Sequence, residues 1–101
     1  MIVARSYTQL GVIQQRRHEF APAIEAGLHA VEEAKKIENE KSRLSTISHA
    51  YLRLGHIYRA SGDFTNAIAN YNEALAASIS EQFLYETHKG KFLAYVGLGD
   101  V

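Results

Sequence analysis

The chain contains no cysteine and has no net charge, because eleven lysines and arginines balance eleven aspartates and glutamates. Without thiols neither a disulfide nor a thiolate zinc site can form, which fits a reducing compartment. Zero net charge removes any whole-molecule electrostatic attraction to nucleic acid or to an anionic membrane. Only a local patch of one sign could provide such attraction.

Long apolar runs are missing as well. The N-terminus offers at most four apolar residues before Arg5, whereas a membrane-spanning helix needs roughly 20, and a signal-peptide core is also longer. We therefore expect a cytoplasmic protein that does not enter a membrane. With 101 residues, the chain is long enough for one domain with a modest core.

The apolar residues recur at spacings of three and four over almost the whole chain, which predicts amphipathic helices and no strands. The single proline, Pro22, stands where a helix can begin, because its missing N–H costs nothing in a first turn. Five helices are expected: about 2–17, 21–38, 44–61, a fourth capped by Asp63 or Thr65, and a fifth from Ser78 to about Gly97. The Ser78-x-x-Glu81 spacing is that of a capping box.

The sequence also repeats itself. Tyr7-x-x-Leu10-Gly11 recurs 44 residues later as Tyr51-x-x-Leu54-Gly55, and Ala23 and Ala30 recur at the same offset as Ala67 and Ala74. At an offset of 37, Tyr58-x-x-x-Gly62-Asp63 recurs as Tyr95-x-x-x-Gly99-Asp100. Small residues are expected at helix crossings, where axes lie about 8 to 10 Å apart, and the large residues are expected to fill the space between hairpins.

These residues resemble the tetratricopeptide repeat. The middle unit has the family's pattern in Tyr51, Leu54, Gly55, Tyr58, Ala67, Tyr71 and Ala74. The first unit is a weaker copy, with Gln14 in place of the tyrosine and Gly27 in place of the second-helix aromatic, and the last unit carries Phe92 where the small glycine should lie. A period of 44 exceeds the family's usual 34 and resembles its longer-helix variety.

The resemblance implies an all-α fold, an α-solenoid of antiparallel helical hairpins in about two and a half units. The expected units are 2–41, 42–78 and a partial 79–101, within what we expect to be a longer array. It further implies a right-handed superhelix whose first helices line a concave groove that holds a peptide or a partner helix, without catalysis. The alternative is a regulatory segment of a larger signalling enzyme or transcription regulator that contacts its own chain.

In this arrangement, the groove is expected to be lined by first-helix residues that face away from their own second helices. They are Arg5, Thr8, Val12, Gln15 and Arg16 in the first unit, His49, Leu52, Arg53, His56 and Arg59 in the second, and Glu86, Lys89 and Leu93 in the third. The several cations predict a partner protein or peptide with acidic groups, held through bidentate arginine contacts. The alternative interpretation is a set of ordinary solvated charges.

Other functions have less support. A chaperone-type carboxylate clamp needs lysine and asparagine where this chain has Thr8 and Val12. His49 and His56 are seven residues apart, about 10.5 Å along a helix, which is too far for one metal ion. No glycine-rich loop follows a strand and no serine stands on a strand-to-helix turn, so neither an enzyme nor a cofactor is expected. A short neutral array also argues against nucleic acid.

The last expected helix carries apolar residues that a further helix would cover, namely Phe92, Tyr95, Val96 and Leu98. Terminal repeats normally present a polar outer face, and here only Lys89 and Lys91 contribute to one. We therefore expect possible self-association through this apolar C-terminal helix.

Overall fold

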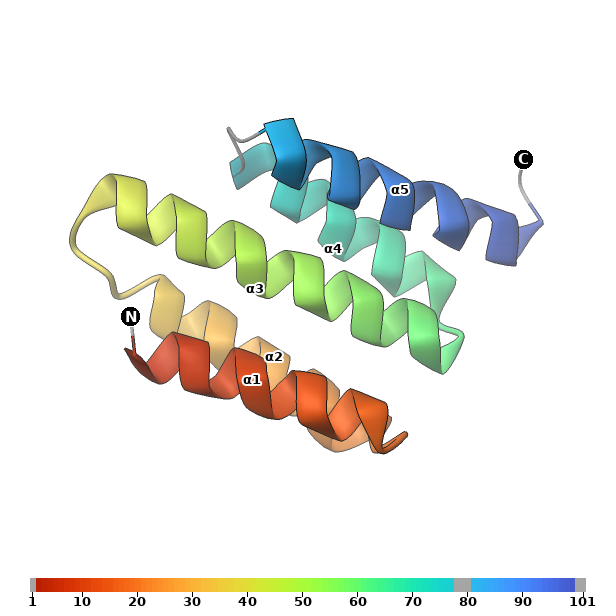
Figure 1. Cartoon of the computed structure of the whole chain (residues 1–101), viewed down its shortest axis with the longest axis horizontal. Coiled ribbons are helices and arrows are strands. Elements are labelled where there is room, and N and C mark those ends of the chain that lie inside the picture. The colour runs from red at the N-terminus through yellow and green to blue at the C-terminus, as the bar shows by residue number, and fades with distance from the viewer. Residues whose placement is uncertain (1, 78–80, 100–101) are drawn as a thin grey trace.

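The computed structural model describes residues 2–77 and 81–99. In this part the chain forms five α-helices: α1 (Ile2–Arg16), α2 (Phe20–Ala34), α3 (Glu40–Ser61), α4 (Phe64–Ala77) and α5 (Glu81–Leu98). The predicted all-α fold of stacked helical hairpins is confirmed (Figure 1). The Ser78-x-x-Glu81 capping box falls partly on residues outside the described ones.

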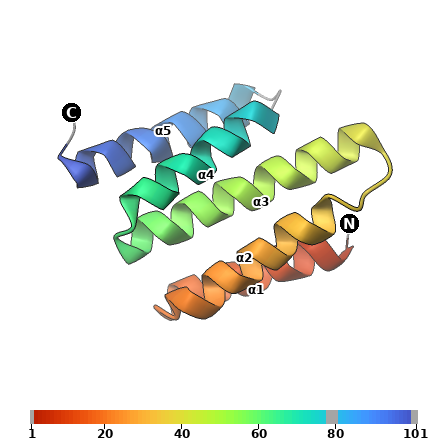
Figure 2. The same cartoon turned by 180° about the vertical axis from the view of Figure 1, so that it is seen from behind.

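The helices form two layers. Figure 1 shows α1, α3 and α5 nearer the viewer, and Figure 2 shows α2 and α4 nearer when the molecule is seen from behind. Consecutive helices pack on each other, and within the first layer α1 also contacts α3 and α3 also contacts α5. Helix α3 is therefore at the centre of the stack, where it contacts each of the other helices.

Small residues lie at the helix crossings, as the repeat predicted. Ala23, Ala30, Ala67 and Ala74 are completely buried. One core cluster joins α2 to α3 through Ala30, Val31, Ala50 and Leu54, and a second joins α3, α4 and α5 through Leu52, Ala67, Tyr71, Ala74, Phe83 and Ala94. Tyr51 and Tyr58 pack against both clusters, so α3 carries a continuous core.

Tyr71 is the largest completely buried side chain. A Cβ atom added at Gly55 of α3 or at Gly90 of α5 would lie 2.6 Å from its ring. The ring therefore occupies space that two glycines on the flanking helices leave open. The small residue of the last unit is therefore Gly90 and not position 92, where the repeat pattern placed it, and Phe92 is exposed instead.

The turn between α3 and α4 follows from local capping chemistry. Gly62 ends α3 with φ 89°, a left-handed conformation that glycine adopts without the steric cost of a Cβ. Asp63 then accepts a hydrogen bond from the Asn66 backbone N–H at 3.2 Å and caps α4. The predicted break at Ser61–Asp63 is confirmed.

The predicted boundaries around 34–42 are wrong. Helix α2 ends at Ala34 rather than Glu38, because the N–H groups of Lys36 and Ile37 turn to the carbonyls three residues back and Arg43 Nη1 donates to the Ile37 carbonyl at 3.1 Å. Helix α3 begins at Glu40, since the Asn39 side chain accepts from the Ser42 N–H at 2.9 Å and caps it. The unit boundary expected between 41 and 42 therefore falls inside α3.

Leu10 does not fill space between hairpins as predicted. Its side chain is 43% exposed, whereas its counterpart Leu54 is completely buried. The reason is position, because α3 has hairpins on both sides while α1 is the first helix of the stack. At the other end Phe92, Val96 and Leu98 of α5 are also exposed, and self-association through them stays a prediction.

Gly27 of α2 gives a test of the close packing against α3. A Cβ atom there would lie 2.5 Å from Leu54 Cδ2 and 2.8 Å from Leu54 Cγ. We expect Gly27→Ala to destabilise the protein by about 1–3 kcal/mol through overpacking, despite the better helix propensity of alanine. In a Leu54→Ala background, where the clash is removed, the same change should be neutral or stabilising in urea unfolding. Equal destabilisation in both backgrounds would contradict this packing.

Candidate functional site

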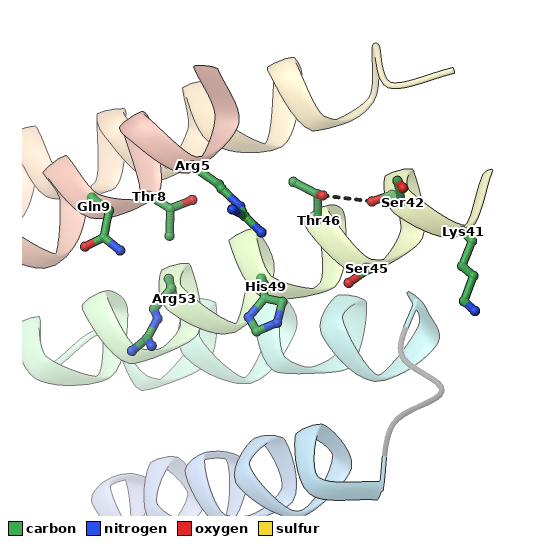
Figure 3. Close-up of a pocket in the computed structure, with 9 residues that line it drawn as sticks. All are labelled: Arg5, Thr8, Gln9, Lys41, Ser42, Ser45, Thr46, His49 and Arg53. Carbon is green, nitrogen blue, oxygen red and sulfur yellow. Dashed lines mark hydrogen bonds between the residues drawn. The ribbon is translucent and has the colours of Figure 1, made fainter. Parts of the chain in front are cut away.

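An open pocket of about 560 Å³ lies between α1 and α3. Figure 3 shows its lining side chains as sticks. They are Arg5, Thr8 and Gln9 from α1, and Lys41, Ser42, Ser45, Thr46, His49 and Arg53 from α3. The pocket is on the side of the stack formed by the first helices of each hairpin, where the sequence predicted a groove.

Helical periodicity explains why these residues come together. On α3, Ser42, Ser45, His49 and Arg53 follow one another at spacings of three and four, which places them along one face. Arg5 and Gln9 have the same relation on α1. In Figure 3 the Arg5 side chain extends from α1 toward α3, whereas the side chains of His49 and Arg53 extend from α3 in the direction away from α1. The pocket is a strip along α3 with α1 as its second wall.

The strip is positively charged. Its lining holds three cations, Arg5, Lys41 and Arg53, and no carboxylate. Over the described residues these three cations make no hydrogen bond or ion pair, while the ion pairs that are found, from Glu25, Glu32 and Glu33, belong to α2 and the turn after it. A neutral protein thus carries a local surface of one sign, and the charged groups there are available to a ligand.

His49 lies in the middle of this strip. Its pKa is lowered from the usual 6.5, first by burial and then by Arg53, with a smaller contribution from Arg5, while Glu86 of α5 acts in the opposite direction. The ring also meets the edge of Phe83 at a centroid distance of 5.1 Å. His49 is therefore neutral at pH 7 and adds no positive charge to the pocket.

The neutral polar groups of the pocket differ in their availability. Thr8 Oγ1 donates to the Ala4 carbonyl at 3.0 Å, and Thr46 Oγ1 donates to the Ser42 carbonyl at 2.8 Å. Within the described part, the hydroxyl groups of Ser42 and Ser45 and the amide of Gln9 have no such intramolecular bond. The two serine hydroxyls and the glutamine amide can therefore donate to a ligand. The hydroxyl hydrogens of Thr8 and Thr46 are already donated to backbone carbonyls, so these two groups can only accept from a ligand.

A second polar cluster lies further along α3, outside the pocket. Tyr71 Oη is 2.7 Å from His56 Nδ1 and accepts a hydrogen bond from Arg59 Nε at 3.1 Å. Arg59 Nη2 is also 3.4 Å from His56 Nδ1. Burial, followed by Arg59 and Arg53, lowers the pKa of His56 to about 4, and burial raises the pKa of Tyr71. Arg59 and His56 therefore support the core tyrosine.

Only some of the predicted groove residues line the pocket. Arg5, Thr8, His49 and Arg53 line the pocket. Val12, Arg16, His56, Arg59 and Lys89 do not, although Arg16 and Lys89 are exposed on α1 and α5. Whether any of them binds a partner stays a prediction.

The placement of Leu52 on the groove is wrong. Its side chain is only 1% exposed and belongs to the core cluster of α3, α4 and α5. Adjacent helical residues point about 100° apart, because a turn takes 3.6 residues. The rotation that directs Arg53 into the pocket therefore turns Leu52 toward α4 and α5.

Sequence reasoning did not identify Gln9, Lys41, Ser42, Ser45 and Thr46 as groove residues. The predicted helix ranges leave Lys41 and Ser42 in a connection, whereas the Asn39 cap places both on α3. Once α3 begins at Glu40, Ser45 lies four residues before His49 on the same face. The sequence signal for this helix start is Asn39, whose side chain caps α3 by accepting from the backbone N–H three residues later.

The described residues contain neither a metal-binding cluster nor a membrane-spanning helix. Between 2 and 77 and between 81 and 99, no three side chains of the His, Cys, Asp and Glu types gather where they could hold a metal ion. Among the helices of the same ranges, none is both long enough and apolar enough to cross a membrane.

Antiparallel helix pairs stacked in two layers define an α-helical repeat protein. Residues 48–78, which include most of α3 and all of α4, match the family model for the tetratricopeptide repeat, which supports the predicted resemblance of the central hairpin to this family. No curated protein and no solved structure gives a significant match to the chain. Repeats of this family generally mediate protein–protein interaction and are typically non-catalytic.

Proposed function

We propose that the strip between α1 and α3 binds an acidic segment of a partner protein. The observation that carries the proposal is a set of three cations, Arg5, Lys41 and Arg53, that have no ion-pair partner among the described residues and line a pocket without a carboxylate. Two of them are arginines on opposite walls, and arginine makes bidentate hydrogen bonds to carboxylates. Ordinary solvated charges would more commonly be mixed in sign over an area of this size.

The length of the strip indicates the length of the segment. Lys41 and Arg53 are twelve residues apart on α3, which corresponds to about 18 Å along the helix axis. An extended chain advances about 3.3 Å per residue, so a segment of roughly five or six residues would span the strip. Acidic side chains near its two ends and its middle would each meet one of the cations.

The proposal is tested with a fluorescein-labelled hexapeptide of alternating glutamate and glycine, measured by fluorescence anisotropy. Arg5→Glu or Arg53→Glu is expected to weaken binding about tenfold at low salt, because each removes a favourable charge and adds a repulsive one. The effect should shrink at high salt, since the Debye length falls from about 10 Å at 0.1 M to about 3 Å at 1 M.

Arg17→Glu provides the matched control. Arg17 follows α1, is exposed and lies outside the pocket, so the same change in net charge should leave the affinity unaltered. Arg59→Glu is less suitable, because Arg59 donates to the buried Tyr71 and its loss would alter stability. Equal weakening by Arg17→Glu and Arg53→Glu would show a general charge effect and would contradict a specific groove.

A further inference from the structure

Each end of the helix stack exposes an apolar stripe. Figure 1 shows α1 along one end and α5 along the other, with α3 between them. The α1 stripe consists of Val3, Ser6, Leu10 and Ile13, and the α5 stripe consists of Tyr85, Lys89, Phe92 and Val96. Their apolar members are between 43% and 68% exposed, and spacings of three and four residues place each set on one side of its helix. None of these residues lines the pocket between α1 and α3.

The α1 stripe repeats a face that is covered in the middle of the stack. At the offset of 44 that relates the first two units, the equivalent residues of α3 are Ile47, Ala50, Leu54 and Ile57. Ala50 and Leu54 belong to the core cluster that α3 shares with α2, and Ile57 is buried where α3 meets α1. Helix α3 therefore receives the preceding hairpin on this face. The α1 stripe is built in the same way, so it suits a helix from the end of another stack.

The α5 stripe is less suited to a closely packed helix of the kind that covers α3. On α3, Gly55 faces α4, and a Cβ atom there would lie 2.6 Å from the Tyr71 ring. At the offset of 37 that relates the last two units, α5 has Phe92 at this position. A helix that covers α5 must therefore stay further away or offer a recess for the phenyl ring. Ser6 is the small residue of the α1 stripe and provides such a recess between larger neighbours.

Charge distinguishes the possible pairings of the two stripes. Lys89 is the one charged residue among their eight members. Two α5 stripes in contact would bring two lysines into one apolar interface, which costs both like-charge repulsion and desolvation. The α1 stripe carries no charge, so a single lysine at its edge can keep its head group in water. The α5 stripe of one copy thus fits the α1 stripe of another better than a second α5 stripe.

We propose that copies of this chain associate head to tail, with the α5 stripe of one copy packed on the α1 stripe of the next. A contact between two different surfaces leaves a free stripe at each end, so it adds further copies and does not stop at a dimer. Helix α1 has 15 residues and is about 22 Å long. A contact along one such helix buries less than the roughly 800 Å² per partner of a standard interface, so association is weak, with a Kd on the order of 10–100 μM.

Sedimentation velocity over concentrations below and above about 100 μM tests the proposal. The wild type should change from monomer to species larger than a dimer. Leu10→Lys blocks the α1 end and Phe92→Lys blocks the α5 end, so each variant alone should remain monomeric. An equimolar mixture of the two should form a heterodimer and nothing larger, because the first variant keeps its α5 stripe and the second keeps its α1 stripe.

Leu28→Lys is the matched control. Leu28 of α2 is 50% exposed and belongs to neither stripe, so the same change in charge should leave association as in the wild type. All three positions are exposed, and circular dichroism should show the same helix content in each variant. Equal loss of association in Leu28→Lys would show a general charge effect and would overturn the assignment to the two stripes.

Other outcomes overturn the proposal in distinguishable ways. Dimers of Leu10→Lys without dimers of Phe92→Lys would show a contact between two α5 stripes, and the reverse would show a contact between two α1 stripes. A mixture of the two variants that stays monomeric would also contradict a head-to-tail contact. A wild type that remains monomeric at every concentration would exclude a second copy as the partner of either stripe. The acidic groove would be unaffected, because its residues lie outside both stripes.

Discussion

Replacing Tyr71 with alanine is expected to lower the free energy of unfolding by about 3–5 kcal/mol, the usual cost of truncating a large buried aromatic. Tyr71 is completely buried and its ring lies between Gly55 of α3 and Gly90 of α5. The two glycines have no side chains with which to fill the space left behind. A domain of this length has a total stability of roughly 5–15 kcal/mol, so the variant should be close to unfolding at room temperature.

Urea unfolding followed by circular dichroism measures this loss, and Tyr71→Phe is the matched control. Phenylalanine keeps the ring and removes only the hydroxyl that lies 2.7 Å from His56 Nδ1 and accepts from Arg59. Its cost should be about 1–3 kcal/mol, that of leaving partly buried polar groups without their partner. If Tyr71→Ala and Tyr71→Phe cost the same, the hydrogen bonds rather than the ring determine stability at this position.

The sequence predicted the positions of the helices well because the information for them is local. Apolar spacing places each helix, and the Ser61–Asp63 turn follows from the chemistry of a left-handed glycine and an aspartate cap. The same reasoning failed at 34–42. There the end of α2 depends on Arg43, which lies on the next helix and donates to the Ile37 carbonyl. A tertiary contact of this kind is not visible in a periodic pattern.

The groove was less predictable than the fold because its composition depends on the rotation of each helix. Leu52 and Arg53 are neighbours in sequence, yet one lies in the core and the other in the pocket. If the predicted rotation of α3 is wrong by one residue, Leu52 is assigned to the pocket and Arg53 to the core. Four of the predicted groove residues line the pocket, and their charge or polarity distinguishes them from core residues. His56 and Arg59 have the same polar character and yet support Tyr71.

Local electrostatics also depends on tertiary structure. Nothing in the sequence around Gln14 indicates that its Oε1 is buried and has no hydrogen-bond partner in residues 2–77 and 81–99. The second repeat has Tyr58 at this position. Likewise, His56 was expected on an open groove, and the structure gives it a pKa of about 4 through burial, Arg59 and Arg53. A pKa shift caused by burial depends on neighbours from other helices, and only the folded structure shows which neighbours these are.

The lowered pKa of His56 predicts that the protein becomes less stable as the pH falls from about 6.5 to about 4. Its pKa is about 4 in the folded state and 6.5 when unperturbed, so in this window the unfolded chain binds more protons and acidification favours unfolding. Each pKa unit corresponds to about 1.4 kcal/mol, which sets the full effect at about 3 kcal/mol. His49, whose pKa is also lowered, contributes in the same direction. Urea unfolding at intervals between pH 7.5 and 4 measures the slope.

His56→Asn isolates the contribution of this histidine. An asparagine oxygen can take the place of Nδ1 and accept the Tyr71 hydroxyl, but it does not titrate in this range. We therefore expect the variant to have a much flatter dependence of stability on pH than the wild type, with similar stability at pH 7. His49→Asn should remove only a smaller part of the slope, because His49 is more exposed. If the slope persists in His56→Asn, His56 is not the proton acceptor, and its ring must already be charged near pH 6 in the folded protein.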